Sequence, residues 1–142
     1  MSNVLITGIA GLLGSHLAEH LVKKGHNVVG IDNLSGGYVE NVPEGVKFYQ
    51  TDLLDHSGVE HIIRDNDIDF IYHFAAYAAV GLSPFIRRFN YQNNVIASAN
   101  LINSSIKHNV KKFIFASSMD VYGEQKPPFF EYMTPAPMDP YG

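Results

Sequence analysis

The sequence contains no cysteine and no tryptophan, and only 17% of its 142 residues are charged. Without cysteine, a disulfide framework and a cysteine-ligated zinc site are both excluded. No apolar run is long enough to span a membrane, and no charged-then-apolar leader precedes the first apolar segment, so we expect a cytoplasmic protein. The net charge of −4 gives no general attraction for nucleic acid or for an anionic membrane. Anion binding must therefore come from local backbone geometry.

What the chain does contain is the composition of a globular domain. Hydrophobic residues make up 46% of it and no shift in composition marks a boundary, so we treat residues 1–142 as one domain. Apolar runs predict strands at Val4–Thr7, Asn27–Ile31, Val46–Gln50, Phe70–Phe74 and Lys112–Ala116. Helical patterns alternate with them at 11–24, after the capping-box sequence Ser57-Gly58-Val59-Glu60, and at 88–108, where Val95, Ala99, Ile102 and Ile106 line one face.

Strands that alternate with helices predict right-handed crossovers and a parallel sheet. We therefore expect an α/β fold, a doubly wound sheet of the Rossmann type with strand order 3-2-1-4-5. The ligand of such a sheet lies over the carboxyl ends of its strands. Asp32, Asp52, Ala75 and Ser118 all fall at or just after such ends, so we expect them to border one crevice.

A glycine-rich turn links the first expected strand to the first expected helix. Gly8 suits a tight turn with positive φ, Gly11 leaves room for a phosphate beside the backbone, and Gly14 lets the helix lie close to the strand. The unpaired N–H groups of the first helical turn form an anion site. The same glycines would also suit a tight strand–helix turn without a ligand, so this motif depends on its context.

The context is an acidic residue at the end of the second strand. Asp32 lies about twenty residues beyond the glycines, where its carboxylate can accept the ribose hydroxyls of NAD. No arginine or lysine lies between Gly30 and Glu40 to pair with a 2′-phosphate, which favours NAD over NADP. The stretch Asn33 to Gly37 suits either a loop that wraps an adenosine or a plain surface loop.

The histidines have simpler interpretations. His16 and His20 share a helix face, but no third ligand is near them in the sequence, so we expect no metal site. His73, at the end of the fourth strand, is expected to be a packed or hydrogen-bonded core residue rather than a catalytic one.

Taken together, these segments resemble the extended short-chain dehydrogenase/reductase family, and within it the NAD-dependent sugar-nucleotide epimerases and dehydratases. The resemblance runs from the glycine-rich turn to Asp139-Pro140-Tyr141-Gly142. Its landmarks in between are Gly30-Ile31-Asp32-Asn33-Leu34, Asp52-Leu53, His73-Phe74-Ala75-Ala76, Asn93-Asn94-Val95, and the segment from Phe115 to Gly123.

The resemblance implies a site for NAD and a pair of catalytic residues. The cofactor-binding residues it implies are Gly8, Gly11, Leu12, Leu13, Gly14, Asp32, Asn33, Leu34, Asp52, Leu53, Phe74, Ala75, Ala76 and Asn93. In this scheme Asp32 holds the adenosine ribose, and Asp52 with Leu53 holds the adenine. Ser118 hydrogen-bonds the sugar hydroxyl that is oxidised, and Tyr141 is the catalytic base.

The implied reaction is an epimerisation of a nucleotide sugar, such as UDP-glucose or UDP-galactose, by transient oxidation at C4. The tyrosine takes the hydroxyl proton while hydride passes to NAD, and hydride then returns to the other face of the sugar. A phenol has an ordinary pKa of about 10, which the family lowers with a lysine four residues later. Four features of the family would follow Gly142: that lysine, the later strands, the sugar-nucleotide domain and a second helix of the homodimer interface. We therefore expect a truncated domain that lacks efficient catalysis alone.

Three departures from the family's patterns leave alternatives open. Met119 stands where dehydratases carry an acid, which argues against 4,6-dehydration. Asp120 stands where decarboxylase-like members carry glutamate, so a UDP-glucuronate decarboxylase remains an alternative. Ala78 replaces a lysine that is frequent in epimerases. A non-catalytic NAD-binding module is the other alternative.

Overall fold

The computed structural model describes all 142 residues and is built on a five-stranded parallel sheet. The strands are β1 Asn3–Thr7, β2 Asn27–Asp32, β3 Val46–Gln50, β4 Phe70–His73 and β5 Lys112–Phe115. Their order in the sheet is β3-β2-β1-β4-β5, with every neighbouring pair parallel. This confirms the strand order that the sequence predicted.

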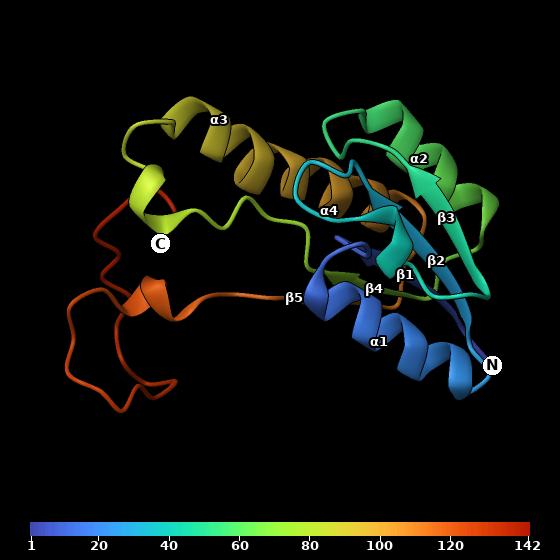
Figure 1. The fold of residues 1–142 in the computed structure, drawn as a ribbon, viewed down its shortest axis with the longest axis horizontal. Coiled ribbons are helices and arrows are strands. Elements are labelled where there is room, and N and C mark those ends of the chain that lie inside the picture. The colour runs from blue at the N-terminus through green and yellow to red at the C-terminus, as the bar shows by residue number, and fades with distance from the viewer.

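Helices cover both faces of the sheet (Figure 1). Helix α1, Leu12–Lys23, lies on one face, and α2, His56–Asp65, and α4, Ala97–Lys107, lie together on the other. A short helix α3, Arg87–Tyr91, continues through a π-helical segment, Gln92–Ile96, into α4. No helix has both the length and the apolar character needed to cross a membrane.

Alternating side chains of β1 divide the core into two clusters. Val4 and Ile6 face α1, where they pack with Ala18 and Leu21. Leu5 faces the other way, into the larger cluster formed with α2 and α4. Because successive strand residues point to opposite faces and both faces are covered, the middle of β1 from Val4 to Ile6 is apolar without alternation. All four residues from Val4 to Thr7 are buried.

The start of α2 differs from the capping box expected at Ser57. The helix already begins at His56, and Asp55 is its N-cap. An Asp55 carboxylate oxygen accepts a hydrogen bond of 3.1 Å from the Gly58 amide. The expectation was wrong because Asp55 is an equally good capping residue and starts the helix earlier, which leaves Ser57 inside it.

The apolar face expected on the long helix is turned toward solvent. Val95, Ile102 and Ile106 are 56%, 40% and 71% exposed. The face of α4 that packs on the domain instead carries small and polar residues around a single leucine, namely Ala97, Ser98, Leu101, Ser104 and Ser105. The long helix therefore presents an unpaired apolar surface.

Residues 116–142 form an irregular segment beside the carboxyl edge of the sheet (orange to red in Figure 1). It contains one short 3-10 turn, Met119–Tyr122. The rings of Tyr122 and Phe129 stack at 5.0 Å, and the Ala136 amide donates to the Val121 carbonyl at 2.8 Å. These contacts fold the segment back on itself, and a hydrogen bond of 3.2 Å from the Ser83 hydroxyl to Asp139 holds its end beside the 3-10 turn Val80–Leu82.

Candidate dinucleotide site at the carboxyl edge of the sheet

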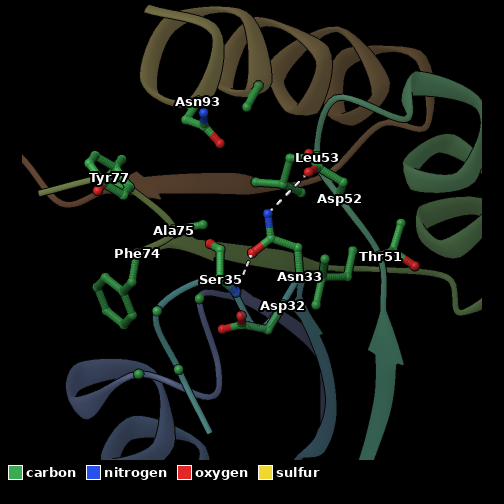
Figure 2. Close-up of a pocket in the computed structure, with 17 residues that line it drawn as sticks. Asp32, Asn33, Ser35, Thr51, Asp52, Leu53, Phe74, Ala75, Tyr77 and Asn93 are labelled. Carbon is green, nitrogen blue, oxygen red and sulfur yellow. Dashed lines mark hydrogen bonds between the residues drawn. The ribbon is translucent and has the colours of Figure 1, made fainter. Parts of the chain in front are cut away.

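A cavity of about 200 Å³ lies over the carboxyl ends of the central strands (Figure 2). Of the residues that the sequence nominated for the cofactor, Gly8, Gly11, Asp32, Asn33, Asp52, Leu53, Phe74, Ala75, Ala76 and Asn93 line it. They come from the ends of β1, β2, β3 and β4 and from the π-helical segment before α4. The topology thus brings together residues that are up to 85 positions apart along the chain, counting from Gly8 to Asn93.

The glycine-rich turn is held by two close backbone approaches. Gly8 has a φ of +71°, and a Cβ there would lie 2.7 Å from the Ala75 nitrogen. A Cβ on Gly14 would collide with the Gly8 carbonyl oxygen. These contacts explain why both positions are occupied by glycine. A side chain at Gly14 would push α1 away from β1, and a side chain at Gly8 would push the turn away from β4.

The first turn of α1 presents unpaired amides beside this turn. The N–H groups of Leu12 and Leu13 have no backbone partner, and the two side chains are 74% and 65% exposed. Neither these leucines nor Gly14 lines the cavity, whereas the preceding Gly11 does. Free amides at the positive end of the helix dipole can bind an anionic group next to the cavity.

Asp32 is fixed at the edge of the cavity by two backbone amides. One carboxylate oxygen accepts from Ala10 at 3.0 Å and the other accepts from Leu34 at 2.8 Å. Each oxygen keeps a free lone pair that can accept a hydroxyl hydrogen. Leu34 does not line the cavity; with a φ of +60°, it forms the tight turn that aims its amide at Asp32.

A second hydrogen-bonded pair joins the loops after β2 and β3. The Asn33 side-chain nitrogen donates to an Asp52 carboxylate oxygen at 3.1 Å, and the Asn33 side-chain oxygen Oδ1 accepts from the Ser35 amide at 3.0 Å (dashed lines in Figure 2). The other Asp52 oxygen accepts from the Leu54 amide at 2.8 Å. These bonds fold the loop over the cavity, so it is not a plain surface loop.

The cavity also has walls that the sequence did not nominate among the cofactor residues. They are Ile31, Ser35, Gly36, Gly37, Thr51, Tyr77 and Ala97. The small residues of the loop after β2 were a weak signal, because glycine and serine suit any loop. Tyr77 follows β4, and its position depends on side chains of the long helix: Asn94 accepts from its amide at 2.7 Å and donates to its carbonyl at 3.2 Å.

A neighbouring cavity of about 190 Å³ contains both nominated catalytic residues, Ser118 and Tyr141. The two cavities share one wall, formed by Phe74, Ala75 and Ala76. A ligand that extends past this wall would therefore reach from Asp32 toward the serine and tyrosine. Asp32, Asp52 and Ala75 border the first cavity, whereas Ser118 borders only the second, so the single crevice that the sequence predicted is divided into two adjoining cavities in this structure.

The serine and the tyrosine are each held by a nearby carboxylate. The Ser118 hydroxyl donates to Asp120 at 2.9 Å and accepts from the Asp120 amide at 3.3 Å, which caps the short turn that follows. Asp139 accepts from the amides of Gly142 at 3.0 Å and Tyr141 at 2.7 Å, and these bonds hold the pKa of its carboxyl below the ordinary value. Tyr141 is thus anchored by its backbone.

His73 is a buried core residue, as expected, and is only 2% exposed. Its Nδ1 lies 2.6 Å from the Thr7 hydroxyl and its Nε2 lies 2.8 Å from the Ser98 hydroxyl. Burial lowers the pKa of the imidazole to about 4, so the ring is neutral at pH 7.

Comparison with known proteins adds a family profile and close relatives. The profile of the NAD dependent epimerase/dehydratase family matches residues 4–142. The UDP-glucose 4-epimerase of Lactobacillus helveticus is 40% identical over 140 residues, which cover 98% of this chain and 42% of that protein. UDP-glucose 4-epimerase uge1 of Schizosaccharomyces pombe is 39% identical over 132 residues, which cover 88% of this chain and 37% of that protein.

Solved structures give the same result. A UDP-glucose 4-epimerase of Thermotoga maritima, solved with UDP-glucose, has a TM-score of 0.94 at 38% identity, covering 99% of this chain and 46% of that one. The UDP-glucose 4-epimerase of Thermus thermophilus, solved as a complex with NAD, has a TM-score of 0.94 at 37% identity, covering 98% of this chain and 46% of that one. The chain spans less than half the length of each of these relatives.

Proposed function

This chain belongs to the NAD dependent epimerase/dehydratase family, and we propose on that premise that it is the NAD-binding part of a nucleotide-sugar epimerase. The proposed enzyme is an isomerase that interconverts UDP-glucose and UDP-galactose by transient oxidation at C4 of the sugar. The observation that carries the proposal is the cavity, which is lined by the fixed carboxylate of Asp32 and by the small residues Ala75 and Ala76, with the free amides of the first turn of α1 next to it.

The residues present fit a dinucleotide. The free amides of Leu12 and Leu13 would hold the pyrophosphate, and the free lone pairs of Asp32 would accept the adenosine ribose hydroxyls. Asp52 and Leu53 would contact the adenine, and Asn93 with the wall at Ala75 would support the nicotinamide end. No lysine or arginine lines the cavity to pair with a 2′-phosphate, so NAD is preferred to NADP.

In the proposed reaction NAD supplies a hydride acceptor that later returns the hydride. Tyr141 takes the proton from the sugar hydroxyl at C4. The Ser118 hydroxyl forms a hydrogen bond with the same sugar oxygen while the charge on that oxygen changes. The lysine that accompanies the tyrosine in the family is not among residues 1–142. We therefore propose that residues 1–142 alone bind NAD without efficient turnover.

One observation favours a second candidate reaction. The Asp120 carboxylate accepts from the Ser118 hydroxyl at 2.9 Å, which places an acid beside the proposed substrate-binding serine. A decarboxylase acting on UDP-glucuronate would share the C4 oxidation and then lose carbon dioxide. A non-catalytic NAD-binding module is the remaining alternative, and it would bind the cofactor without turnover in any length of chain.

The proposal extends to assembly, domain and location. The exposed apolar side chains of Val95, Ile102 and Ile106 offer a face for homodimerisation. The second helix of the family's interface is not among residues 1–142, so we propose that these residues alone form no stable dimer.

Residues 1–142 form one NAD-binding domain in this scheme. The proposed location is cytoplasmic, which fractionation of cells producing the native protein would test.

The proposal is tested by titrating the chain with NAD and with NADP in a calorimeter. We expect NAD to bind at least about tenfold more tightly than NADP, and Asp32→Ala to remove most of the NAD affinity. Asp55→Ala, which alters a helix cap outside the cavity, is the control and keeps wild-type affinity. No binding at millimolar NAD would refute the proposal. In a longer chain that includes the lysine, UDP-galactose turnover supports the epimerase, and carbon dioxide release from UDP-glucuronate supports the decarboxylase.

A further inference from the structure

Three buried polar side chains connect β1, β4 and α4 beside the wall that the two cavities share. They are Thr7 at the end of β1, His73 at the end of β4 and Ser98 in the first turn of α4, with exposures of 0%, 2% and 8%. The two hydroxyls lie at opposite ring nitrogens of the histidine, at 2.6 Å and 2.8 Å. The three side chains therefore form one continuous hydrogen-bonded chain.

The neighbouring backbone groups set the direction of this chain. The Thr7 oxygen accepts from the Ala75 amide at 3.3 Å, so its hydrogen is available for Nδ1 of His73. The Ser98 hydroxyl donates to the Asn94 carbonyl, so its oxygen accepts from Nε2–H of His73. Every donor then has one acceptor, provided that the imidazole is neutral and protonated at Nε2.

Both ends of the chain hold the same segment of backbone. At one end, the Thr7 hydroxyl accepts from the Ala75 amide, and Ala75 lines both cavities. At the other end, Asn94 brackets the backbone of Tyr77, accepting from its amide at 2.7 Å and donating to its carbonyl at 3.2 Å. The stretch Phe74–Tyr77, which includes the shared wall, is thus held from β1 and from the long helix.

Packing alone does not account for this arrangement. An apolar side chain could fill the space of a buried imidazole, and a buried polar group that loses its partner is destabilising by about 1–3 kcal/mol. A hydrogen bond fixes both the distance and the direction between its two groups. The hydrogen bonds of Thr7, His73 and Ser98 can therefore hold the backbone of the shared wall in one position beside a ligand. None of the three side chains needs to touch a ligand to exert this effect.

We propose that Thr7, His73 and Ser98 are positioning residues that fix the wall segment Phe74–Tyr77 against the nicotinamide end of the dinucleotide. This inference rests on the proposed function for its ligand, but the hydrogen-bonded chain stands independently of it. Its loss loosens the wall and weakens NAD binding. His73 and Ser98 border the second cavity, whereas Thr7 lines neither cavity, so a substitution at Thr7 removes no group that borders the proposed ligand site.

The first test compares two substitutions at one position. Thr7→Val keeps the shape of the side chain and removes the hydroxyl, whereas Thr7→Ser keeps the hydroxyl and removes the methyl group. We expect Thr7→Val to raise the Kd for NAD by about three- to tenfold, the equivalent of one net hydrogen bond, and Thr7→Ser to stay within about twofold of wild type. A purely structural role would lower the unfolding midpoint of both variants and leave both Kd values unchanged, which would overturn the proposal.

The second test observes the Thr7–His73–Ser98 hydrogen bonds directly, by long-range proton–nitrogen NMR of the ¹⁵N-labelled protein. The expected spectrum shows His73 protonated at Nε2 only, and Thr7→Val and Ser98→Ala shift the amide signals of Ala75 and Tyr77. A ring protonated at Nδ1 would overturn the proposal. If wild-type chain fails to bind NAD, the proposed function fails, yet the tautomer and the amide shifts still decide the wall-holding role. If Thr7→Val does not fold, Ser98→Ala supplies the Kd comparison, and an unchanged value counts against the proposal.

Discussion

Burial of a single imidazole makes the stability of this domain depend on pH. The folded pKa of His73 is about 4, whereas an unfolded histidine has a pKa of about 6.5. Between these values the unfolded chain binds a proton that the folded chain excludes, so stability is complete above pH 6.5 and is lost as the pH falls toward 4. We expect the free energy of unfolding to be about 2 kcal/mol lower at pH 5 than at pH 7, measured by urea unfolding.

The control for this effect is His73→Gln, which keeps polar atoms at the site but does not titrate. Its free energy of unfolding should change much less between pH 7 and pH 5. The carboxyls whose pKa is lowered by ion pairs, Glu60 beside Lys107 and Asp69 beside Lys111, lose their contribution only at more acidic pH. A wild-type pH dependence that survives in the glutamine variant would contradict the assignment.

Two glycines with similar φ values allow steric contact to be separated from backbone strain. Gly8 has a φ of +71° and a Cβ there would lie 2.7 Å from the Ala75 nitrogen, whereas Gly25 has a φ of +80° with nothing within 4 Å. Gly25→Ala should cost about 1–2 kcal/mol from its positive φ alone. Gly8→Ala should cost about 1–3 kcal/mol more because the backbone after β4 must move. Equal losses in urea unfolding would show that the contact is not rigid.

Predictions for single residues were most reliable where the residue's own chemistry or its position in a motif determines its place in the fold. Gly8 adopts a positive φ that suits glycine, and Asp32 ends β2 about twenty residues after the glycine-rich turn, so the positions of both could be predicted from the sequence. The neighbours of Ser118 and the placing of Tyr77 could not, because the first depends on an irregular segment and the second on a side-chain amide from a distant helix. Their roles in binding and catalysis stay predictions.

At the scale of elements, the start of α2 shows how a local signal is decided by competition. Asp55 accepts from the Gly58 amide at 3.1 Å, while Ser57, the residue that the capping-box pattern indicated, lies within the helix. We expect Asp55→Ala to lower the free energy of unfolding by about 1 kcal/mol, and Ser57→Ala to change it by less than about 0.5 kcal/mol. Thermal or urea unfolding of the two variants decides between them, and the opposite ranking would restore the capping box.

The long helix shows a different limit of sequence analysis at this scale. Its apolar residues were correctly placed on one face, but periodicity does not say whether that face meets the domain or solvent. Here Leu101 is fully buried in the larger core cluster, while Ile106 is 71% exposed. Two serines on the buried face have partners, since Ser98 bonds His73 and the Ser105 hydroxyl donates to the Ile102 carbonyl, and such partners are visible only after folding.

At the scale of the whole molecule, the doubly wound topology is what turns scattered residues into one site. Each parallel strand ends at the same edge, so the turn after β1, the carboxylate after β2 and the wall after β4 converge without any direct sequence relation. Strand order was predictable because it follows from the alternation of strands and helices and the doubly wound pattern that this alternation favours, and not from individual contacts. A ligand seated across several strand ends must therefore stabilise the domain as a unit.

That coupling leads to a prediction about thermal unfolding. A ligand that binds only the folded state adds about 2.7 kcal/mol at a concentration one hundred times its Kd, which for a domain of this size corresponds to a rise in Tm of roughly 8 °C. We expect NAD to produce this rise in the wild-type chain and NADP to produce a much smaller rise at equal concentration.

The Tm of Asp55→Ala should be lower than that of wild type without ligand and should rise by the same amount with NAD, because this helix cap lies outside the cavity. Asp32→Ala should show almost no rise, since the ribose contact belongs to the folded site. A rise that persists in Asp32→Ala would mean that NAD binds elsewhere on the domain, and no rise in wild type would mean that the folded cavity does not hold it.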